Sequence, residues 1–297
     1  MQHLGRAVLA LSLAALLGAC SSIVPQAHVP RIVVFGDSNV DNGNLYKLTG
    51  DQLPPPPNWR GRNSNGPNVV EYLAKDVGAT LEDYAVSGAT TGQLNIVGHF
   101  SPALARFAGT GMSWQIGEFI KTGHPFSDRD VIILWAGSND IFHQQRNDAG
   151  LLQLRIAEAS ANIRGALHRL YGLGARRIVV ATRTPREMIG NDNDMNGVDL
   201  NRQLRQLVAD THDLPGAHIM VFDAYASVAD MMQHPARYGF SENGQLCVVV
   251  PACASERYED GLHVADTYIN WDAAHKTTHV HRIMAQQLAQ LLRHQAD

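Results

Sequence analysis

The chain lacks a large excess of charge of either sign. It has 24 Lys and Arg residues and 28 Asp and Glu residues, which give a formal net charge of −4. The two signs are intermixed along the sequence, which argues against a protein that binds nucleic acid through a basic patch. The zinc-binding pattern His-Glu-x-x-His and a phosphate-cradling loop with a lysine are also missing. We therefore expect no metal and no nucleotide cofactor, and a small or neutral partner.

A hydrophobic run long enough to cross a bilayer is absent from the N-terminal region. The apolar stretch from Ala7 to Leu17 is shorter than the about 20 helical residues that a membrane span requires. Arg6 precedes this stretch and small residues follow it, a pattern typical of an export signal. A short buried helix is the alternative.

The end of this stretch, Leu17-Gly18-Ala19-Cys20, resembles the lipobox of bacterial lipoproteins, in which the cysteine receives diacylglycerol and becomes the new N-terminus. The resemblance implies a signal peptide over residues 1–19, lipidation of Cys20 and a tether over residues 20–30. Several acyl chains anchor a protein stably where a single chain binds only marginally. Ser21 follows the cysteine, which resembles the outer-membrane sorting pattern. We expect an exported protein anchored to the cell envelope, on the periplasmic or surface face of the outer membrane.

Cysteine is scarce, with three residues in the whole chain. Without Cys20, only Cys247 and Cys253 remain, in the sequence CVVVPAC. Disulfides persist in exported proteins, so we predict that these two cysteines pair. Two free buried thiols are the alternative.

Short apolar runs rich in Val and Ile alternate with segments of helical periodicity, which predicts a parallel sheet with right-handed crossovers. The runs span residues 31–35, 81–86, 131–136, 177–182 and 218–223. The helical segments span residues 68–77, 114–121, 151–173, 199–209 and 277–293. Because the chain shows no repeat, composition break or long linker, we expect one α/β/α domain over residues 31–297, with loops at 54–66 and 241–261.

Polar residues that can do chemistry follow the predicted strands, where ligands bind in open parallel sheets. Ser38 follows the first strand, although a residue there can also cap a helix. Gly88 follows the second strand and can aim its backbone NH, and Asn139 follows the third with an amide that can donate to an oxyanion. Near the C-terminus, Asp272 precedes His275 by three residues, close enough to hold the Nδ1 proton of the ring.

These segments resemble the GDSL esterase/lipase family, the SGNH hydrolases, in four motif blocks and in their order. The blocks are FGDSNVDNGN, YAVSGATTG, WAGSND and WDAAHKTTHVHRIMA, and GRNSNGPNVVEYLA resembles the segment after the first block. The resemblance implies a flavodoxin-like, five-stranded parallel sheet in a three-layer α/β/α fold. It also implies that Ser38 is the nucleophile, His275 the base and Asp272 its orienting acid. The implied oxyanion donors are the Ser38 NH, Gly88 and Asn139.

Three positions depart from the family pattern without removing a catalytic atom: Asn39 stands where leucine is common, Asp83 where asparagine often precedes the glycine block, and Lys276 where proline usually follows the histidine. Asn39 would make the mouth of the site more polar, which weakens the inference to a long-chain lipid. The expected function is a serine esterase or lipase acting on lipid, lysophospholipid or small carboxylic esters. The alternatives are a polysaccharide O-acetylesterase and a non-catalytic surface lipoprotein that binds glycan or lipid.

Two rival interpretations concern other residues. The chain has 14 histidines, and the rivals of His275 are His263, His279 and His281. The partner Asp272, three residues earlier, favours His275, whereas His279 and His281 lie on the helix predicted to follow and lack such a carboxylate. The segment 192–197 matches the first half of a calcium loop and then fails, since Gln203 occupies the twelfth position. A solvated loop leading to a helix capped by Asp199 is the favoured interpretation. The aromatic residues considered for a hydrophobic pocket, with the core as the alternative, are Phe100, Phe107, Trp114, Phe126 and Phe142.

Overall fold

A computed structural model of the chain describes residues 31–142, 148–186 and 192–294. The predictions of a signal peptide, of lipidation at Cys20 and of a tether lie outside the described residues. Among those residues, no helix combines the length and the apolar character that a membrane span needs.

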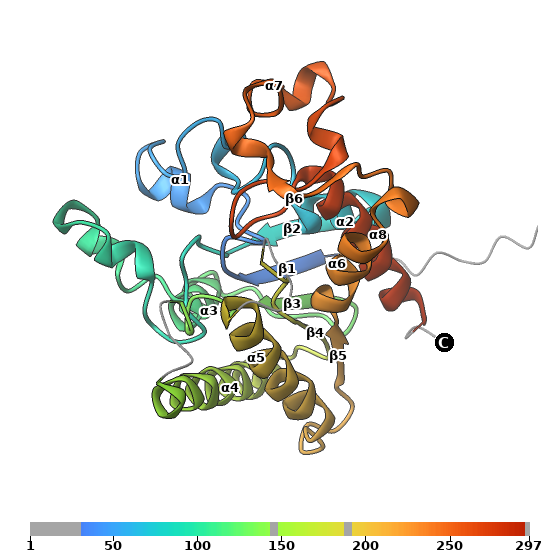
Figure 1. Ribbon diagram of the computed structural model, residues 1–297. Helices are drawn as coiled ribbons and strands as arrows, with labels where there is room; N and C mark the ends of the chain where they lie inside the picture. The colour runs from blue at the N-terminus through green and yellow to red at the C-terminus, as the bar shows by residue number, and fades with distance from the viewer. Residues whose placement is uncertain (1–30, 143–147, 187–191, 295–297) are drawn as a thin grey trace, which may run out of the picture.

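The centre of the fold is a parallel five-stranded sheet in the order β2-β1-β3-β4-β5 (Figure 1). The strands are β1 (Arg31–Gly36), β2 (Thr80–Asp83), β3 (Val131–Trp135), β4 (Arg177–Ala181) and β5 (His218–Phe222). This arrangement confirms the predicted fold class. The run 81–86 is strand only as far as Asp83, although the NH groups of Tyr84 and Val86 still donate to the Val34 and Gly36 carbonyls of β1.

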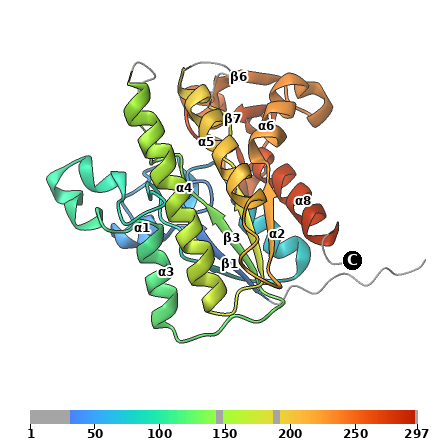
Figure 2. The ribbon, with the colours of Figure 1, turned by 90° about the horizontal axis from the view of Figure 1, so that it is seen from below.

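Helices cover both faces of this sheet (Figures 1 and 2). Helices α2 (Val69–Val77), α6 (Ala224–Gln233) and α8 (Thr278–His294) pack on one face, and α3 (Met112–Lys121), α4 (Ala149–Gly172) and α5 (Asp192–Ala209) pack on the other. Successive side chains of a strand point to opposite faces, so Ile32 and Val34 enter one core while Val33 and Phe35 enter the other. Two apolar cores therefore hold the rigid frame from which the strand ends project.

A second, two-stranded sheet was not predicted. Strands β6 (Glu242–Leu246) and β7 (Tyr268–Asn270) pair in parallel, so the expectation of a continuous loop over 241–261 was wrong. Cys247 and Cys253 form a disulfide with Cα atoms 5.3 Å apart, and both pack against Trp271. The short polar run of β6 lacks the apolar alternation that would have marked it as a strand.

Helix α5 begins at Asp192, so the segment 192–197 is helical rather than a calcium loop. Asp199 lies inside this helix, and its predicted role as a cap was wrong. The first turns of α5 contain the polar residues Asp194 and Asn196, and both are buried against the rest of the protein. The described residues contain no group of three or more His, Cys, Asp or Glu side chains placed to hold a metal ion.

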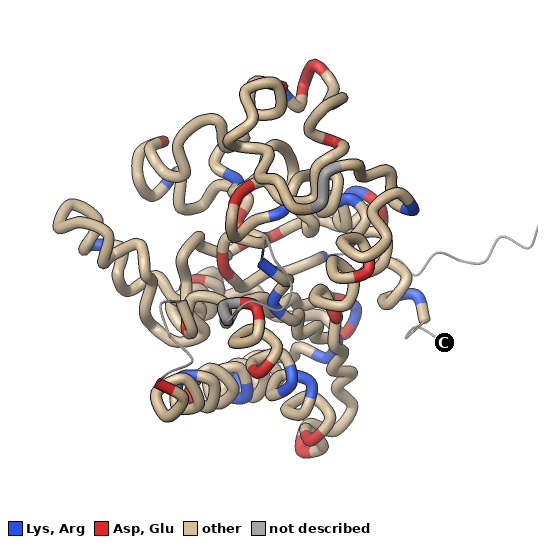
Figure 3. Tube along the Cα trace, in the orientation of Figure 1, with Lys and Arg blue, Asp and Glu red and all other residues tan. Residues whose placement is uncertain are grey.

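The remaining elements are short. They are α1 (Asn44–Leu48), α7 (Pro251–Ala254) and the 3-10 helices Trp59–Gly61, Ile96–His99, Pro102–Phe107, Pro235–Tyr238, Cys247–Val249, Tyr258–Asp260 and Ala265–Thr267. Acidic and basic residues are interspersed along the whole trace rather than gathered by sign (Figure 3). Few of them lie on the arm from Ile96 to Phe107, whose one Lys or Arg is Arg106.

Candidate active site

Ser38 lies in the turn that leaves the carboxyl end of β1. Gln115 on α3 fixes this strand end, because its side chain accepts from the Gly36 NH at 2.8 Å and donates to the Gly36 carbonyl at 2.9 Å. A Cβ atom at Gly36 would lie 2.4 Å from the carbonyl oxygen of Trp135, so glycine is required where β1 and β3 meet. The half-buried Ser38 side chain therefore emerges from a rigid strand end into a cavity.

The imidazole of His275 joins Ser38 to Asp272. Its Nε2 atom lies 2.8 Å from Ser38 Oγ, and its Nδ1 atom lies 2.9 Å from each carboxylate oxygen of Asp272. Asp272 Oδ1 also accepts the backbone NH groups of Ala274 at 2.7 Å and of His275 at 2.8 Å. The structure thus brings the three predicted side chains into one hydrogen-bonded array, across 237 positions of sequence.

The carboxylate of Asp272 is strongly stabilised in its charged form. Burial alone would raise the pKa of this group, but the charge and hydrogen bonds of His275, together with the Ala274 NH, outweigh burial and hold the pKa well below its usual range. An ionised carboxylate only accepts hydrogen bonds, so the proton of a neutral His275 ring resides on Nδ1. The lone pair of Nε2 then faces the Ser38 hydroxyl.

The rival histidines have other partners. His279 Nδ1 lies 2.6 Å from the carbonyl oxygen of Asp266, and the backbone NH of His263 bonds to Glu256. His281 is buried, and burial lowers the pKa of its ring to about 3. Within the described residues, none of the three rings shares a hydrogen bond with Ser38.

The predicted oxyanion donors lie around the same cavity. Gly88 and Asn139 line it together with Ser38, and Asn139 Nδ2 donates one hydrogen bond to the carbonyl oxygen of Ala89 at 2.9 Å. In the described part of the chain, the backbone NH groups of Ser38 and Gly88 have no protein acceptor. Unpaired donors beside a nucleophile are suited to bind an oxygen that becomes charged during reaction.

Asp140, next to Asn139, ties the exit of β3 to the glycine-rich segment. Its carboxylate accepts the Thr91 NH at 3.0 Å and the Thr91 hydroxyl at 2.6 Å. Burial raises the pKa of Asp140 to about 6 in spite of these bonds. The Gly-x-Asn-Asp motif therefore supplies both the cavity-lining amide of Asn139 and the carboxylate of Asp140, which bonds to Thr91 in the glycine-rich segment.

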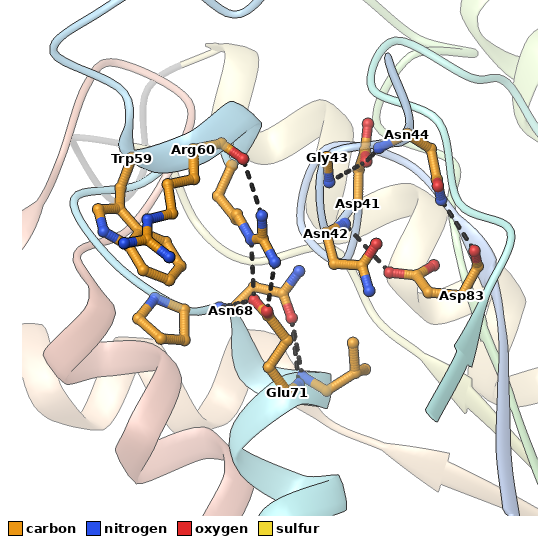
Figure 4. A network of polar contacts seen from close by, with 12 residues as sticks. Asp41, Asn42, Gly43, Asn44, Trp59, Arg60, Asn68, Glu71 and Asp83 are labelled. Atoms are coloured by element: carbon orange, nitrogen blue, oxygen red, sulfur yellow. Dashed lines mark hydrogen bonds and ion pairs between the residues drawn. The ribbon is translucent and has the colours of Figure 1, made fainter. Parts of the chain in front are cut away.

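Two further carboxylates, those of Asp41 and Asp83, hold the segment after Ser38, and the sequence analysis predicted this role for neither (Figure 4). Asp41 accepts the Asn44 NH at 2.6 Å and the Ser87 NH at 2.7 Å, and Asp83 accepts the Asn42 NH at 3.1 Å. Burial raises the pKa of both carboxyl groups. Asp41 was present in the first motif block, but its partner Ser87 is remote in sequence.

Two departures from the family pattern are turned inward. The Asn39 side chain is 7% exposed and donates to Asp37 Oδ1 at 2.7 Å, so its amide nitrogen is engaged inside the protein although the residue lines the cavity. The expected polar mouth at Asn39 is accordingly reduced. Lys276 is buried, and its ammonium group lies 2.5 Å from Asn270 Oδ1.

The cavity has a volume of about 270 Å³. Its apolar lining, the apolar wall, consists of Leu45, Leu53, Pro54, Pro55, Ile96, Val97 and Phe100. Phe142, Arg183, Thr184 and Arg186 also line the cavity. Of the five aromatic residues considered, Phe100 and Phe142 line the cavity, whereas Phe107 and Phe126 are buried in the core and Trp114 packs beside Val97.

A three-layer α/β fold with a serine, a histidine and a carboxylate in one hydrogen-bonded array at the sheet edge defines the class of serine hydrolases. The family model described as GDSL-like lipase/acylhydrolase matches residues 32–288. The chain belongs to this family and is a carboxylic ester hydrolase.

Relatives of known name agree with this assignment. The chain is 24% identical to the thermolabile hemolysin of Vibrio parahaemolyticus over 284 residues, which are 88% of this chain and 63% of the hemolysin. It is 28% identical to the phosphatidylcholine-sterol acyltransferase of Aeromonas hydrophila over 234 residues, which are 73% of this chain and 65% of that enzyme. The chain thus spans less than two thirds of the length of either bacterial relative. A GDSL esterase/lipase of Arabidopsis thaliana is 25% identical over 318 residues, 88% of this chain and 90% of the plant protein.

Solved structures share the fold at low sequence identity. A member of the lipolytic G-D-S-L family from Veillonella parvula gives a TM-score of 0.52 at 15% identity, covering 89% of this chain and 98% of that one. An acetyl xylan esterase gives a TM-score of 0.51 at 12% identity, covering 88% and 99%.

Proposed function

We propose that the chain hydrolyses acyl esters of lipids through an acyl-enzyme intermediate on Ser38. The observation that carries the proposal is the 2.8 Å contact between Ser38 Oγ and His275 Nε2, with Asp272 on the opposite side of the ring. Serine is a weak nucleophile until an adjacent base removes its proton, and this array supplies that base.

In the proposed reaction, Ser38 Oγ attacks the ester carbonyl carbon while its proton moves to His275 Nε2. The carbonyl oxygen becomes an oxyanion, which accepts hydrogen bonds from the Ser38 NH, the Gly88 NH and the Asn139 amide. His275 then protonates the leaving alcohol as the carbon–oxygen bond breaks. Water repeats the sequence on the acyl-enzyme, which releases the carboxylic acid and regenerates Ser38.

The apolar wall of the cavity is suited to bind the acyl group of the substrate, and it favours a longer acyl chain over an acetyl group. Leu45, Leu53, Ile96 and Phe100 belong to this wall, and burial of apolar surface contributes roughly 25 cal/mol per Å² to binding. Asn39 leaves this wall largely undisturbed, because its amide is bonded to Asp37. The acyltransferase named above also takes a phospholipid, by its name, but that substrate belongs to the relative.

Covalent labelling tests this proposal at its first step. A fluorophosphonate should label the wild-type chain at Ser38 and leave Ser38→Ala unlabelled. On a chromogenic ester series from acetyl to dodecanoyl, kcat/KM should rise beyond acetyl. Lack of labelling would indicate a non-catalytic binding protein, and a maximum at acetyl would favour removal of O-acetyl groups from polysaccharide.

We also propose that the chain is exported and anchored through Cys20. The motif before Cys20 and the disulfide between Cys247 and Cys253 support this proposal, since disulfides are typical of exported proteins. In a bacterial host, labelled fatty acid should be incorporated into the wild-type chain. Incorporation into Cys20→Ser at the same level would contradict the anchor.

A further inference from the structure

The oxyanion donor Gly88 lies in a tight turn whose central peptide has two possible orientations. The Ala89 NH donates to the Val86 carbonyl at 3.0 Å, which closes a four-residue β-turn over Val86–Ala89. Gly88 occupies the third position with φ 85°, the value that a type II turn requires there. The central peptide of this turn carries the Ser87 carbonyl and the Gly88 NH, which point in opposite directions.

Rotation of that central peptide would convert the turn to type I without breaking its closing hydrogen bond. Glycine populates positive and negative φ about equally, so Gly88 itself does not favour one form. In the type I form the Gly88 NH would point the other way and the Ser87 carbonyl would replace it. A carbonyl oxygen in place of a donor would repel an oxyanion, so the site needs the type II form.

Asn95 holds the central peptide in the type II form from one side. It is fully buried, and its Nδ2 atom donates to the Ser87 carbonyl at 3.0 Å and to Thr110 Oγ1 at 2.9 Å. Its Oδ1 atom accepts the Val97 NH at 2.9 Å. Because a backbone NH can only donate, the Val97 contact fixes which end of the amide faces Ser87.

Asp41 holds the same turn from the other side. Its Oδ2 atom accepts the Ser87 NH at 2.7 Å and the Ser87 hydroxyl at 2.8 Å, while its Oδ1 atom accepts the NH groups of Gly43 and Asn44 at 2.8 and 2.6 Å (Figure 4 shows the contacts to Gly43 and Asn44). Every polar group of Ser87 therefore has a partner: its NH and hydroxyl bond to Asp41 and its carbonyl bonds to Asn95. Asp41 fixes where the turn lies, and Asn95 fixes which way its central peptide faces.

We propose that Asn95 is a positioning residue for catalysis, which keeps the Gly88 NH directed at the oxyanion by binding the opposite end of the same peptide unit. This inference rests on the proposed function, in which Gly88 is an oxyanion donor. A buried asparagine that served stability alone would affect folding but would leave the reaction of the folded protein unchanged.

The test variant is Asn95→Asp, which keeps size and shape but places a carboxylate oxygen against the Ser87 carbonyl. We expect kcat for a soluble chromogenic ester to fall on the order of 100-fold, with KM changed by less than about threefold, because the loss concerns the transition state. The affinity for a trifluoromethyl ketone, which forms a tetrahedral oxyanion adduct with Ser38, should fall by a similar factor. Asn68→Asp is the matched control, because Asn68 is equally buried and donates to the Val40 carbonyl at 2.8 Å, away from Gly88.

Unchanged ketone affinity in folded Asn95→Asp would overturn the inference, and so would an equal loss of kcat in Asn68→Asp. If Asn95→Asp fails to fold, Thr110→Val removes the hydroxyl that accepts the second hydrogen of the Asn95 amide and that donates to the Phe107 carbonyl at 2.8 Å. That variant should show a smaller loss in kcat with the same unchanged KM, and wild-type kcat would again refute the inference. Failure of the proposed function is distinguishable, because the wild-type chain would then neither hydrolyse the ester nor react with a fluorophosphonate.

Discussion

Replacement of Asp272 by asparagine should abolish most of the activity, for a reason that the contacts specify. Asp272 Oδ1 accepts two backbone NH groups, from Ala274 at 2.7 Å and from His275 at 2.8 Å. In Asp272→Asn this position must remain an oxygen, since an NH₂ group there would face two donors. The new amide nitrogen must then occupy the position of Oδ2, 2.9 Å from His275 Nδ1.

An amide nitrogen donates, so we expect Nδ1 of His275 to become its acceptor and the ring proton to move to Nε2. The other acceptor within reach of an Nδ1 proton, Oδ1 at 2.9 Å, already accepts two backbone NH groups. Nε2 then carries a proton toward Ser38 and cannot remove the proton of the hydroxyl. The wrong tautomer in a triad of this type costs about 10⁴-fold in kcat, which corresponds to about 5 kcal/mol of barrier. We expect Asp272→Asn to lose activity on this scale at pH 7.5 while its melting temperature changes little.

The assay is hydrolysis of a soluble chromogenic ester, with thermal unfolding measured on the same samples. Asp266→Asn is the control, because Asp266 is a carboxylate of the same C-terminal region that lies 3.6 Å from Arg282 and does not contact His275. Retention of more than about a tenth of wild-type kcat by Asp272→Asn would refute the tautomer argument.

Three further predictions concern the site and its frame. Asn139→Ala should lower kcat about 100- to 1000-fold in the same assay, since it removes one oxyanion donor, and a loss under about tenfold would exclude that role. Asp140 has a folded-state pKa of about 6, above its unfolded value, so the stability that it contributes is present in acid and is lost as the pH rises through 6. The contribution of Asp140 to this loss should be up to about 3 kcal/mol between pH 4 and 8, measured by urea unfolding as the difference between the wild-type chain and Asp140→Asn. The difference is needed because burial also raises the pKa of Asp41 and Asp83, which remain in both proteins. The double replacement of Cys247 and Cys253 by serine should lower the free energy of unfolding by about 2 kcal/mol, because the closed loop is short, with a sequence separation of 6.

The main sheet was predictable because most of its strands are short runs of apolar residues. The segments 131–136 and 178–181 are apolar throughout, as strands covered on both faces must be, and a helical period separates them. The strand β6 was missed because its sequence, ENGQL, is polar and short. The start of α5 was missed because acidic residues and asparagine at 192–196 are typical of a turn, and only burial in the tertiary structure makes them helical.

The reacting groups were also predictable, because Ser38 directly follows a predicted strand and Asp272 precedes His275 by three residues. Ser38 and the pair Asp272 and His275 meet as the motifs indicate. Their supports could not be predicted, since Asn95 and Asp41 act through hydrogen bonds to Ser87, and hydrogen bonds leave no period in a sequence. The inward turn of Asn39 was missed for the same reason.

The nucleophile and its base stand on different sheets. Ser38 extends from the large parallel sheet, whereas His275 follows β7 of the small disulfide-bearing sheet. Trp271, which lies between β7 and His275 in the sequence, packs on Cys247 and Cys253. Neither sheet alone holds a complete reaction centre. Ester hydrolysis therefore reports whether the two sheets are packed together. A cleaved or partly folded chain should be inactive in the assay even while most of its helices and strands persist.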